Sequence, residues 1–155
     1  MKKEQLFNVV IYGAIALFSI LGLALAALPA LDWIGFSSAS IWECAFGNSD
    51  GLDAHVGLIF ALLLGFVLPL AIATLELLKE FKVMKFEINP LFVGCAIALL
   101  SLVAFILFLC TESIVTEGNT SSSIDLAGGA ICAIIFSALN LLLGGAIIAL
   151  KFTKK

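Results

Sequence analysis

The sequence is poor in charge and lacks arginine altogether. Only 12% of its 155 residues are charged and 63% are hydrophobic, whereas soluble domains carry about 25% charged residues. A chain so short and so apolar has no room for a separate catalytic domain outside a membrane. The lack of arginine and the net charge of −3 also exclude the basic surface that binds nucleic acids, so we expect no nucleic-acid partner.

Residues that could form a catalytic, metal-binding or phosphate-binding site are scarce as well. The one histidine, His55, stands at the edge of an apolar stretch, where it cannot assemble a Ser-His-acid triad. The four cysteines form no C-x-x-C pair, which argues against zinc sites of the spaced-pair type and against thiol-disulfide enzymes. No glycine-rich loop with a lysine is present to hold a phosphate. We therefore expect no enzymatic activity, no cofactor and no metal site.

Long stretches without Asp, Glu, Lys or Arg dominate what is present. They cover residues 5–31, 56–75, 88–111 and 126–150. Because a helix rises about 1.5 Å per residue and the hydrocarbon layer is about 30 Å thick, roughly 20 apolar residues are enough for one span. Lipid offers no hydrogen-bond partners, and stretches that are apolar on every face are typical of helices rather than of barrel strands.

The sequence thus predicts an all-α fold, namely an integral membrane four-helix bundle with up-down-up-down topology in a single domain, residues 1–155. The transmembrane spans are expected at about residues 7–30, 56–77, 88–110 and 127–150, with outer links 31–55 and 111–126 and an inner link 78–87. Because the last two links are short, neighbours in sequence are expected to be antiparallel neighbours in space.

The lysines predict the orientation. All eight lie at the two ends of the chain or near the inner link, at positions 2, 3, 79, 82, 85, 151, 154 and 155. Basic residues in short flanking segments stay in the cytoplasm, so both termini and the inner link are expected there. The sequence therefore predicts a multi-pass protein of the cell membrane, with its two acidic outer links on the other side.

The first outer link contains both tryptophans and two phenylalanines, at Trp33, Phe36, Trp42 and Phe46. One interpretation is an interfacial aromatic belt, in which amphipathic rings lie among lipid headgroups. The other is a surface that docks a partner, because aromatic side chains also anchor interfaces. The sequence does not separate these interpretations.

The run Leu28-Pro29-Ala30-Leu31-Asp32-Trp33, followed by Trp42-Glu43-Cys44, resembles the start of the first outer segment of claudin-type proteins. The chain departs from that pattern because the outer link lacks its second cysteine and is short for the extracellular sheet of the family. We take no function from the resemblance.

The cysteines leave one pairing open. Cys44 lies in the first outer link and Cys110 at the outer end of the third span, so both are expected on the oxidising side of the membrane. A disulfide between them is one interpretation, and two free thiols are the other. Cys95 and Cys132 lie within spans and are expected to be small packing residues.

Polar and backbone-exposing residues gather near the midpoint of every span. We call this set the polar layer, and it comprises Ser19, Gly65, Pro69, Ser101, Ser137 and Asn140. One interpretation is interhelical hydrogen bonding, and the other is a small hydrated or solute-binding point at the bilayer midplane. No charged residue joins this layer, and Glu76 is close enough to Lys79 and Glu80 to reach the inner interface, which argues against a proton-coupled mechanism.

Small residues also repeat at four-residue spacing in every span, for example at Gly57, Ala61 and Gly65. Such rows let helix backbones approach closely. We therefore expect a non-catalytic structural or accessory subunit that packs against other membrane helices, either in a homo-oligomer or in a larger complex, with membrane lipids around it. The alternative is a small transporter or channel for an uncharged or weakly polar solute that passes through the polar layer.

Overall fold

The computed structural model describes residues 2–33, 38–47, 54–111, 124–126 and 128–153. Among these residues, four helical spans are long and apolar enough to cross a membrane. They are α1 (Lys3–Leu25), a second span made of α3 (Val56–Leu62), η1 (Leu63–Val67) and α4 (Leu68–Glu80), then α5 (Pro90–Leu109) and α7 (Gly128–Thr153). The expected all-α four-helix bundle of an integral, multi-pass membrane protein is thereby confirmed.

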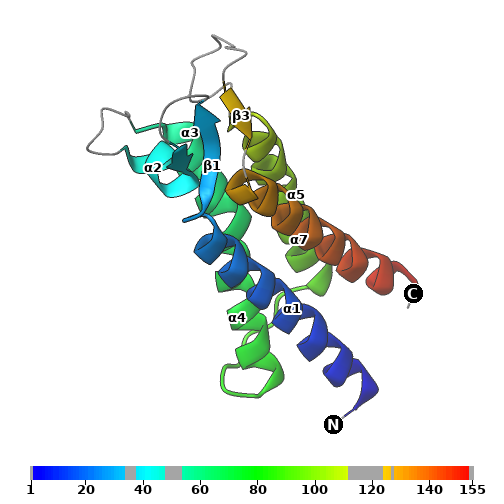
Figure 1. Cartoon of the computed structure of the whole chain (residues 1–155). Helices are drawn as coiled ribbons and strands as arrows, with labels where there is room; N and C mark the ends of the chain where they lie inside the picture. Colours follow the sequence, from blue (N-terminus) through cyan, green and yellow to red (C-terminus); the bar gives the residue numbers. More distant parts are fainter. Residues whose placement is uncertain (1, 34–37, 48–53, 112–123, 127, 154–155) are drawn as a thin grey trace.

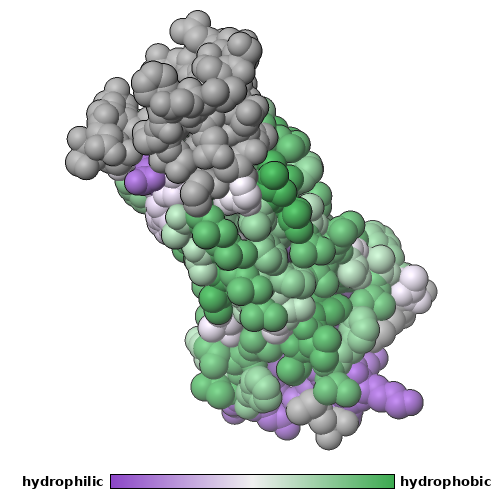
Figure 2. All heavy atoms as spheres, viewed as in Figure 1, coloured by the Kyte–Doolittle hydropathy of each residue, from purple (hydrophilic) through white to green (hydrophobic). Residues whose placement is uncertain are grey.

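The spans run antiparallel to their neighbours in sequence (Figure 1). α1 packs against α4 and α7, while α5 packs against α7 and against α3 and η1. Both chain ends lie at one end of the bundle, which we call the terminal end, and the strands lie at the other, the sheet end. Figure 2 shows apolar residues along the helices and hydrophilic residues gathered at the terminal end. A surface of this kind suits lipid along its length.

The sheet end contains three short strands that the sequence analysis did not anticipate. β1 (Pro29–Trp33) lies between β2 (Ser38–Ser40) and β3 (Ile124–Leu126), and both pairs are antiparallel. The register places Asp32 opposite Ser38 on one side and opposite Asp125 on the other. The two outer links are therefore joined in one sheet.

The first span ends at Leu25, not near residue 30 as expected. Two turns follow, in which the N–H groups of Ala27 and Leu28 bond to carbonyls three residues earlier. Pro29 explains the boundary, because the residue before a proline is disfavoured in the helical region. The residues after Leu25 are as free of charge as the helix itself, so a count of uncharged residues cannot detect this turn.

The short helix α2 (Ile41–Phe46) packs against α3 and β2, and hydrogen bonds tie it to the end of α1. Ser40 and Glu43 form a capping box, in which each side chain accepts a hydrogen bond from the other residue's backbone N–H. The backbone N–H of Ile41 donates to the carbonyl of Ala26, and Trp42 Nε1 donates to the carbonyl of Leu23 over 3.0 Å. The first outer link is thus fastened to the span that precedes it.

The buried apolar side chains form two clusters. The cluster nearer the sheet end includes Leu58, Phe66, Ala104, Phe108 and Ala133. The cluster nearer the terminal end includes Ile11, Ile15, Ala73, Ile97 and Ile147. Members of the two clusters flank in sequence Ser19, Pro69, Ser101, and Ser137 with Asn140. The apolar core is therefore divided near its middle by polar groups.

Candidate functional site: a buried polar layer

All six residues of the polar layer are buried in the bundle. Ser19 comes from α1, Gly65 from η1, Pro69 from α4, Ser101 from α5, and Ser137 and Asn140 from α7. Every span therefore contributes to the layer that separates the two apolar clusters. In a lipid-embedded bundle, water outside cannot satisfy these groups, so their partners must come from within the protein or from molecules bound there.

Asn140 links three spans. Its Nδ2 donates to Ser19 Oγ of α1 over 3.1 Å and to the carbonyl oxygen of Gly65 in η1 over 3.4 Å. An asparagine amide carries two N–H donors, so this one side chain can link α7 to α1 and to η1 at once. The arrangement is the interhelical hydrogen bonding expected of a polar residue in a membrane bundle.

The carbonyl of Gly65 is available because of Pro69. A proline has no N–H to donate to the carbonyl four residues earlier, which here is that of Gly65. The helix responds with the π-turn η1, in which the N–H of Leu68 bonds to the carbonyl of Leu63, five residues back. Sequence analysis placed Gly65 and Pro69 in the layer, but nothing in the sequence showed that Asn140 donates to this carbonyl.

Two atoms of the layer have no hydrogen-bond partner among the described residues. They are Ser101 Oγ and Asn140 Oδ1, and both are fully buried. Gly144 faces Ala98 across the α5–α7 contact, so one turn along each antiparallel helix brings Asn140 to the level of Ser101. Ser137, in contrast, bonds within α7, donating to the carbonyl of Ile134 over 3.0 Å.

The helices approach closely at the layer and on its terminal side. At Gly65, which belongs to the layer, an added Cβ would lie 2.7 Å from the Cβ of Ala104. Nearby, the Phe66 and Phe108 rings stack with centroids 5.5 Å apart. Toward the terminal end, a Cβ added at Gly144 would lie 2.8 Å from the backbone nitrogen of Ala98. Neither glycine therefore has room for a methyl group unless the facing helix moves.

The aromatic residues of the first outer link differ in burial and in their contacts. Trp42 is partly buried and its ring stacks on that of Phe46, with centroids 5.8 Å apart, while Phe46 is exposed. Trp33 lies in strand β1, and Phe36 lies outside the described residues. The hydrogen bond from Trp42 to Leu23 anchors one of these rings to the bundle, but neither the belt nor the docking interpretation is tested.

No disulfide joins Cys44 to Cys110, since both are free thiols, Cys44 buried in α2 and Cys110 exposed after α5. Burial, together with the neighbouring Glu43 carboxylate, raises the pKa of Cys44 to about 11. The ring Nδ1 of His55 lies within hydrogen-bond distance, 3.0 Å, of the backbone carbonyl oxygen of Cys44. Among the residues that the structure describes, no three His, Cys, Asp or Glu side chains are grouped to hold a metal ion.

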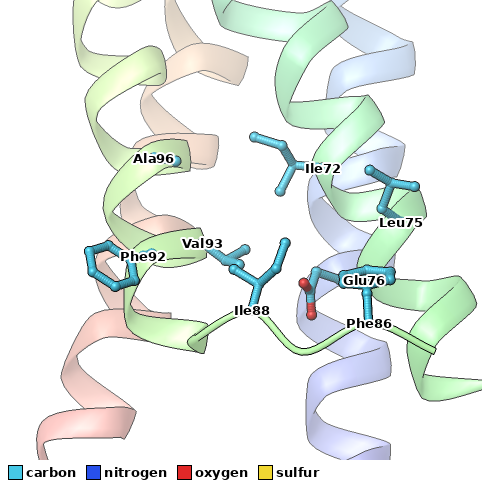
Figure 3. A pocket seen from close by; sticks show the side chains of 8 residues that line it. All are labelled: Ile72, Leu75, Glu76, Phe86, Ile88, Phe92, Val93 and Ala96. Atoms are coloured by element: carbon cyan, nitrogen blue, oxygen red, sulfur yellow. The ribbon is translucent and has the colours of Figure 1, made fainter. Parts of the chain in front are cut away.

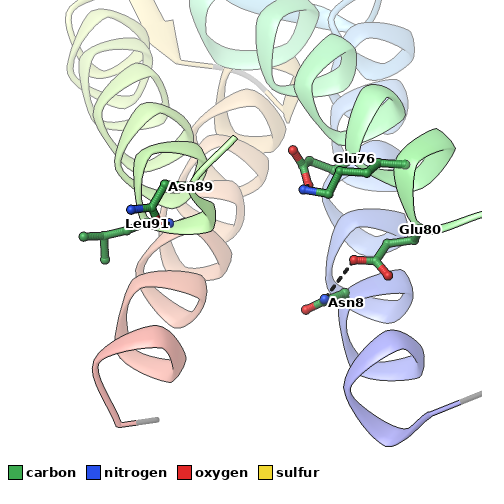
Figure 4. A network of polar contacts seen from close by, with 6 residues as sticks. Asn8, Glu76, Glu80, Asn89 and Leu91 are labelled. Carbon is green, nitrogen blue, oxygen red and sulfur yellow. Dashed lines mark hydrogen bonds and ion pairs between the residues drawn. The ribbon is translucent and has the colours of Figure 1, made fainter. Parts of the chain in front are cut away.

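Glu76 is more deeply buried than the sequence indicated. We expected its side chain to reach the inner interface, but only 3% of that side chain is exposed. Its Oε2 pairs with Lys79 Nζ at 2.8 Å. One turn further along α4, Glu80 accepts a hydrogen bond from Asn8 of α1 over 2.9 Å (Figure 4). The sequence places Lys79 one turn after Glu76, but it shows neither the ion pair nor the burial of the carboxylate.

Searches for related proteins find no matching family model, no matching curated protein and no matching solved structure.

Proposed function

We propose that this multi-pass membrane protein is a non-catalytic structural subunit that packs against other membrane helices. The observation that supports this proposal is the closed centre of the bundle. Asn140 donates hydrogen bonds to Ser19 and Gly65, and the helices pack closely at Gly65 and at Gly144. A solute crossing the bundle would have to break these contacts, whereas a scaffold benefits from their rigidity.

The orientation that we propose places the terminal end in the cytoplasm of a cell membrane. The described lysines at positions 2, 3, 79, 82, 85 and 151 lie near the two chain ends or in and next to the inner link. The chain ends share one end of the bundle (Figure 1). Short basic flanks are retained on the cytoplasmic side during insertion, which supports this direction.

The outer face of α7 suits contact with another helix. A Cβ added at Gly145 would meet no atom within 4 Å, so this glycine is not required by the bundle's own packing. Ala149 follows four residues later and is also exposed. Small residues at this spacing allow a neighbouring helix to approach closely.

The test combines native membranes with a matched pair of variants. Blue-native electrophoresis after mild solubilisation should find the parent protein in an assembly of fixed mass. Gly145→Leu adds bulk only to the outer face and should release the folded subunit from that assembly. Gly13→Leu, at a glycine of α1 where an added Cβ also meets no atom within 4 Å, should leave the assembly intact. A protein that migrates as a monomer in every mild detergent would contradict the proposal.

A second candidate function, a small transporter for an uncharged or weakly polar solute, is favoured by one observation. Ser101 Oγ and Asn140 Oδ1 are buried without partners, beside a span interrupted by η1 and Pro69. Interrupted helices with polar groups near the midplane occur in transport sites. Proteoliposomes containing the parent protein should then take up small polar solutes, and Asn140→Leu should abolish that flux. The absence of flux from the parent protein would exclude this candidate.

A further inference from the structure

A lateral pocket of about 260 Å³ lies between α4 and α5 at the terminal end. Of the eight described residues that line it, seven are apolar and the eighth is Glu76. The lining comes from α4, from the link after it, and from α5, with Phe86 and Ile88 of the link closing the lower side (Figure 3). The pocket lies apart from the polar layer.

The link that closes the pocket begins with a tight helix C-cap. Lys82 adopts a left-handed conformation with φ 61°. The N–H of Val83 bonds to the carbonyl of Leu78, and that of Lys82 to the carbonyl of Lys79, which is a Schellman motif. On the other side, Asn89 caps α5 by accepting a hydrogen bond from the N–H of Leu91 over 3.0 Å. Both ends of the link are therefore fixed, and the pocket has defined walls.

The rim of the pocket faces the surroundings of the bundle and is apolar. Leu75, Ile88 and Phe92 are 44%, 49% and 69% exposed. In a bundle embedded in a membrane, such side chains face hydrocarbon. The pocket is therefore entered from the lipid, and a water-soluble ligand would have to cross an apolar rim to reach it.

One ammonium group lies at the wall of this pocket. Lys79 Nζ is 2.8 Å from Glu76 Oε2 and 5.5 Å from the centre of the Phe86 ring, and both of these residues line the pocket. An ammonium group carries three N–H donors, and the pair with Glu76 accounts for one. Its side chain is 23% exposed, so Lys79 can bind a further oxygen anion while it remains paired. Exposed Lys85 lies directly before Phe86.

An apolar pocket open to lipid, with a cation at the end of the span, is complementary to a phospholipid. We propose that this pocket binds one phospholipid of the leaflet at the terminal end, with an acyl chain between α4 and α5 and the phosphate on Lys79. Basic groups at the ends of membrane helices bind lipid headgroups in this manner. The site does not depend on the scaffold or the transporter function.

Native mass spectrometry can test the site directly. The purified protein is incubated with equal amounts of a phospholipid and of a diacylglycerol that carries the same acyl chains. We expect one phospholipid to remain bound, at least fivefold more often than the diacylglycerol. Ala96→Phe fills the pocket and should reduce retention at least fivefold, whereas Leu99→Phe, on the exposed face of α5, should not.

Each remaining outcome has a defined meaning. Equal retention by the parent protein, Ala96→Phe and Leu99→Phe would identify ordinary surrounding lipid and overturn the proposal. Equal retention of the diacylglycerol would show that the phosphate is not recognised, and would overturn the proposed contact between the phosphate and Lys79. Should Ala96→Phe fail to fold, a phospholipid with a photoreactive acyl chain keeps the test decisive in the parent protein. Crosslinks should concentrate on residues 72–96, and an even distribution over α1 and α7 would contradict the site.

Discussion

At the scale of single residues, the side chain of Asn140 joins three spans through hydrogen bonds. It connects α7 to α1 and to η1 through one amide group. Such contacts between membrane helices contribute about 0.6–2 kcal/mol each. Loss of the amide would also leave Ser19 and the Gly65 carbonyl without that donor in a region closed to water.

We expect Asn140→Leu to lower the free energy of unfolding by about 1–3 kcal/mol, because two interhelical hydrogen bonds are lost. Equilibrium unfolding in mixed micelles, with increasing fractions of a denaturing detergent, measures this change. Leu142→Ala on the exposed face of the same helix is the control and should change the stability by less than about 0.5 kcal/mol. Equal stability of Asn140→Leu and the parent protein would show that the amide contacts contribute nothing net.

Cys44 gives a second prediction at this scale. Its raised pKa, about 11, means that almost all of it is neutral thiol at pH 8, and the thiolate is the reactive form. In the folded protein, N-ethylmaleimide should modify exposed Cys110 faster than buried Cys44, with the rate at Cys44 rising about tenfold per pH unit below its pKa. Mass spectrometry of the modified peptides measures both rates. Rapid modification of Cys44 at pH 7 would contradict its burial.

The polar layer shows which part of the site could be predicted from the sequence. Positions near the middle of each uncharged stretch identified Ser19, Ser101 and Asn140 as neighbours in depth, because helix rise converts sequence position into depth. The rotation of each helix, which decides that Asn140 bonds to Ser19 and not to Ser101, depends on packing with other spans. A pattern of residues within one span does not contain that information.

At the scale of secondary-structure elements, the spans were predictable and their ends were not. Uncharged stretches located all four helices because only helices and closed barrels span lipid, and these stretches are apolar on every face. The boundary at Leu25 and the strand after it depend on Pro29 and on pairing with β2 and β3. The pairing with β3 is non-local, so the adjacent sequence, with its apolar residues, favoured a longer helix.

Two adjacent glycines of α7 provide a matched test of helix contact. A Cβ at Gly144 would lie 2.8 Å from the backbone nitrogen of Ala98, which cannot move aside as a side chain can. Gly144→Ala should therefore cost about 1–3 kcal/mol of stability through overpacking. Gly145→Ala meets open space and should be neutral or stabilising by up to about 1 kcal/mol, since alanine favours helix.

The same mixed-micelle unfolding measures both variants. If Gly144→Ala were as stable as Gly145→Ala, the α5–α7 contact would have to be looser than the structure indicates. The two positions share a helix, a depth and a residue type. A general effect of alanine on α7 would therefore change the stability of both variants by the same amount.

At the scale of the whole molecule, the distribution of charge predicts one orientation in the membrane. A membrane-impermeant amine reagent applied to intact cells should leave every lysine unmodified, because the orientation that we propose places the terminal end in the cytoplasm. After permeabilisation, the exposed lysines 2, 3, 82 and 85 should react. Mass spectrometry of tryptic peptides measures both states, and modification of these lysines in intact cells would reverse the proposed orientation.

The pairing of β1 with β3 has a consequence for how the chain is made. β1 ends at Trp33, whereas β3 begins at Ile124, so the first strand leaves the ribosome long before its second partner exists. Ser19 likewise cannot accept its hydrogen bond from Asn140 until that residue has been synthesised. Contacts so distant in sequence close late in folding, and unpaired strand edges make unfinished chains prone to aggregation. A nascent chain interrupted before its fourth helix would therefore be inserted in the membrane without being assembled.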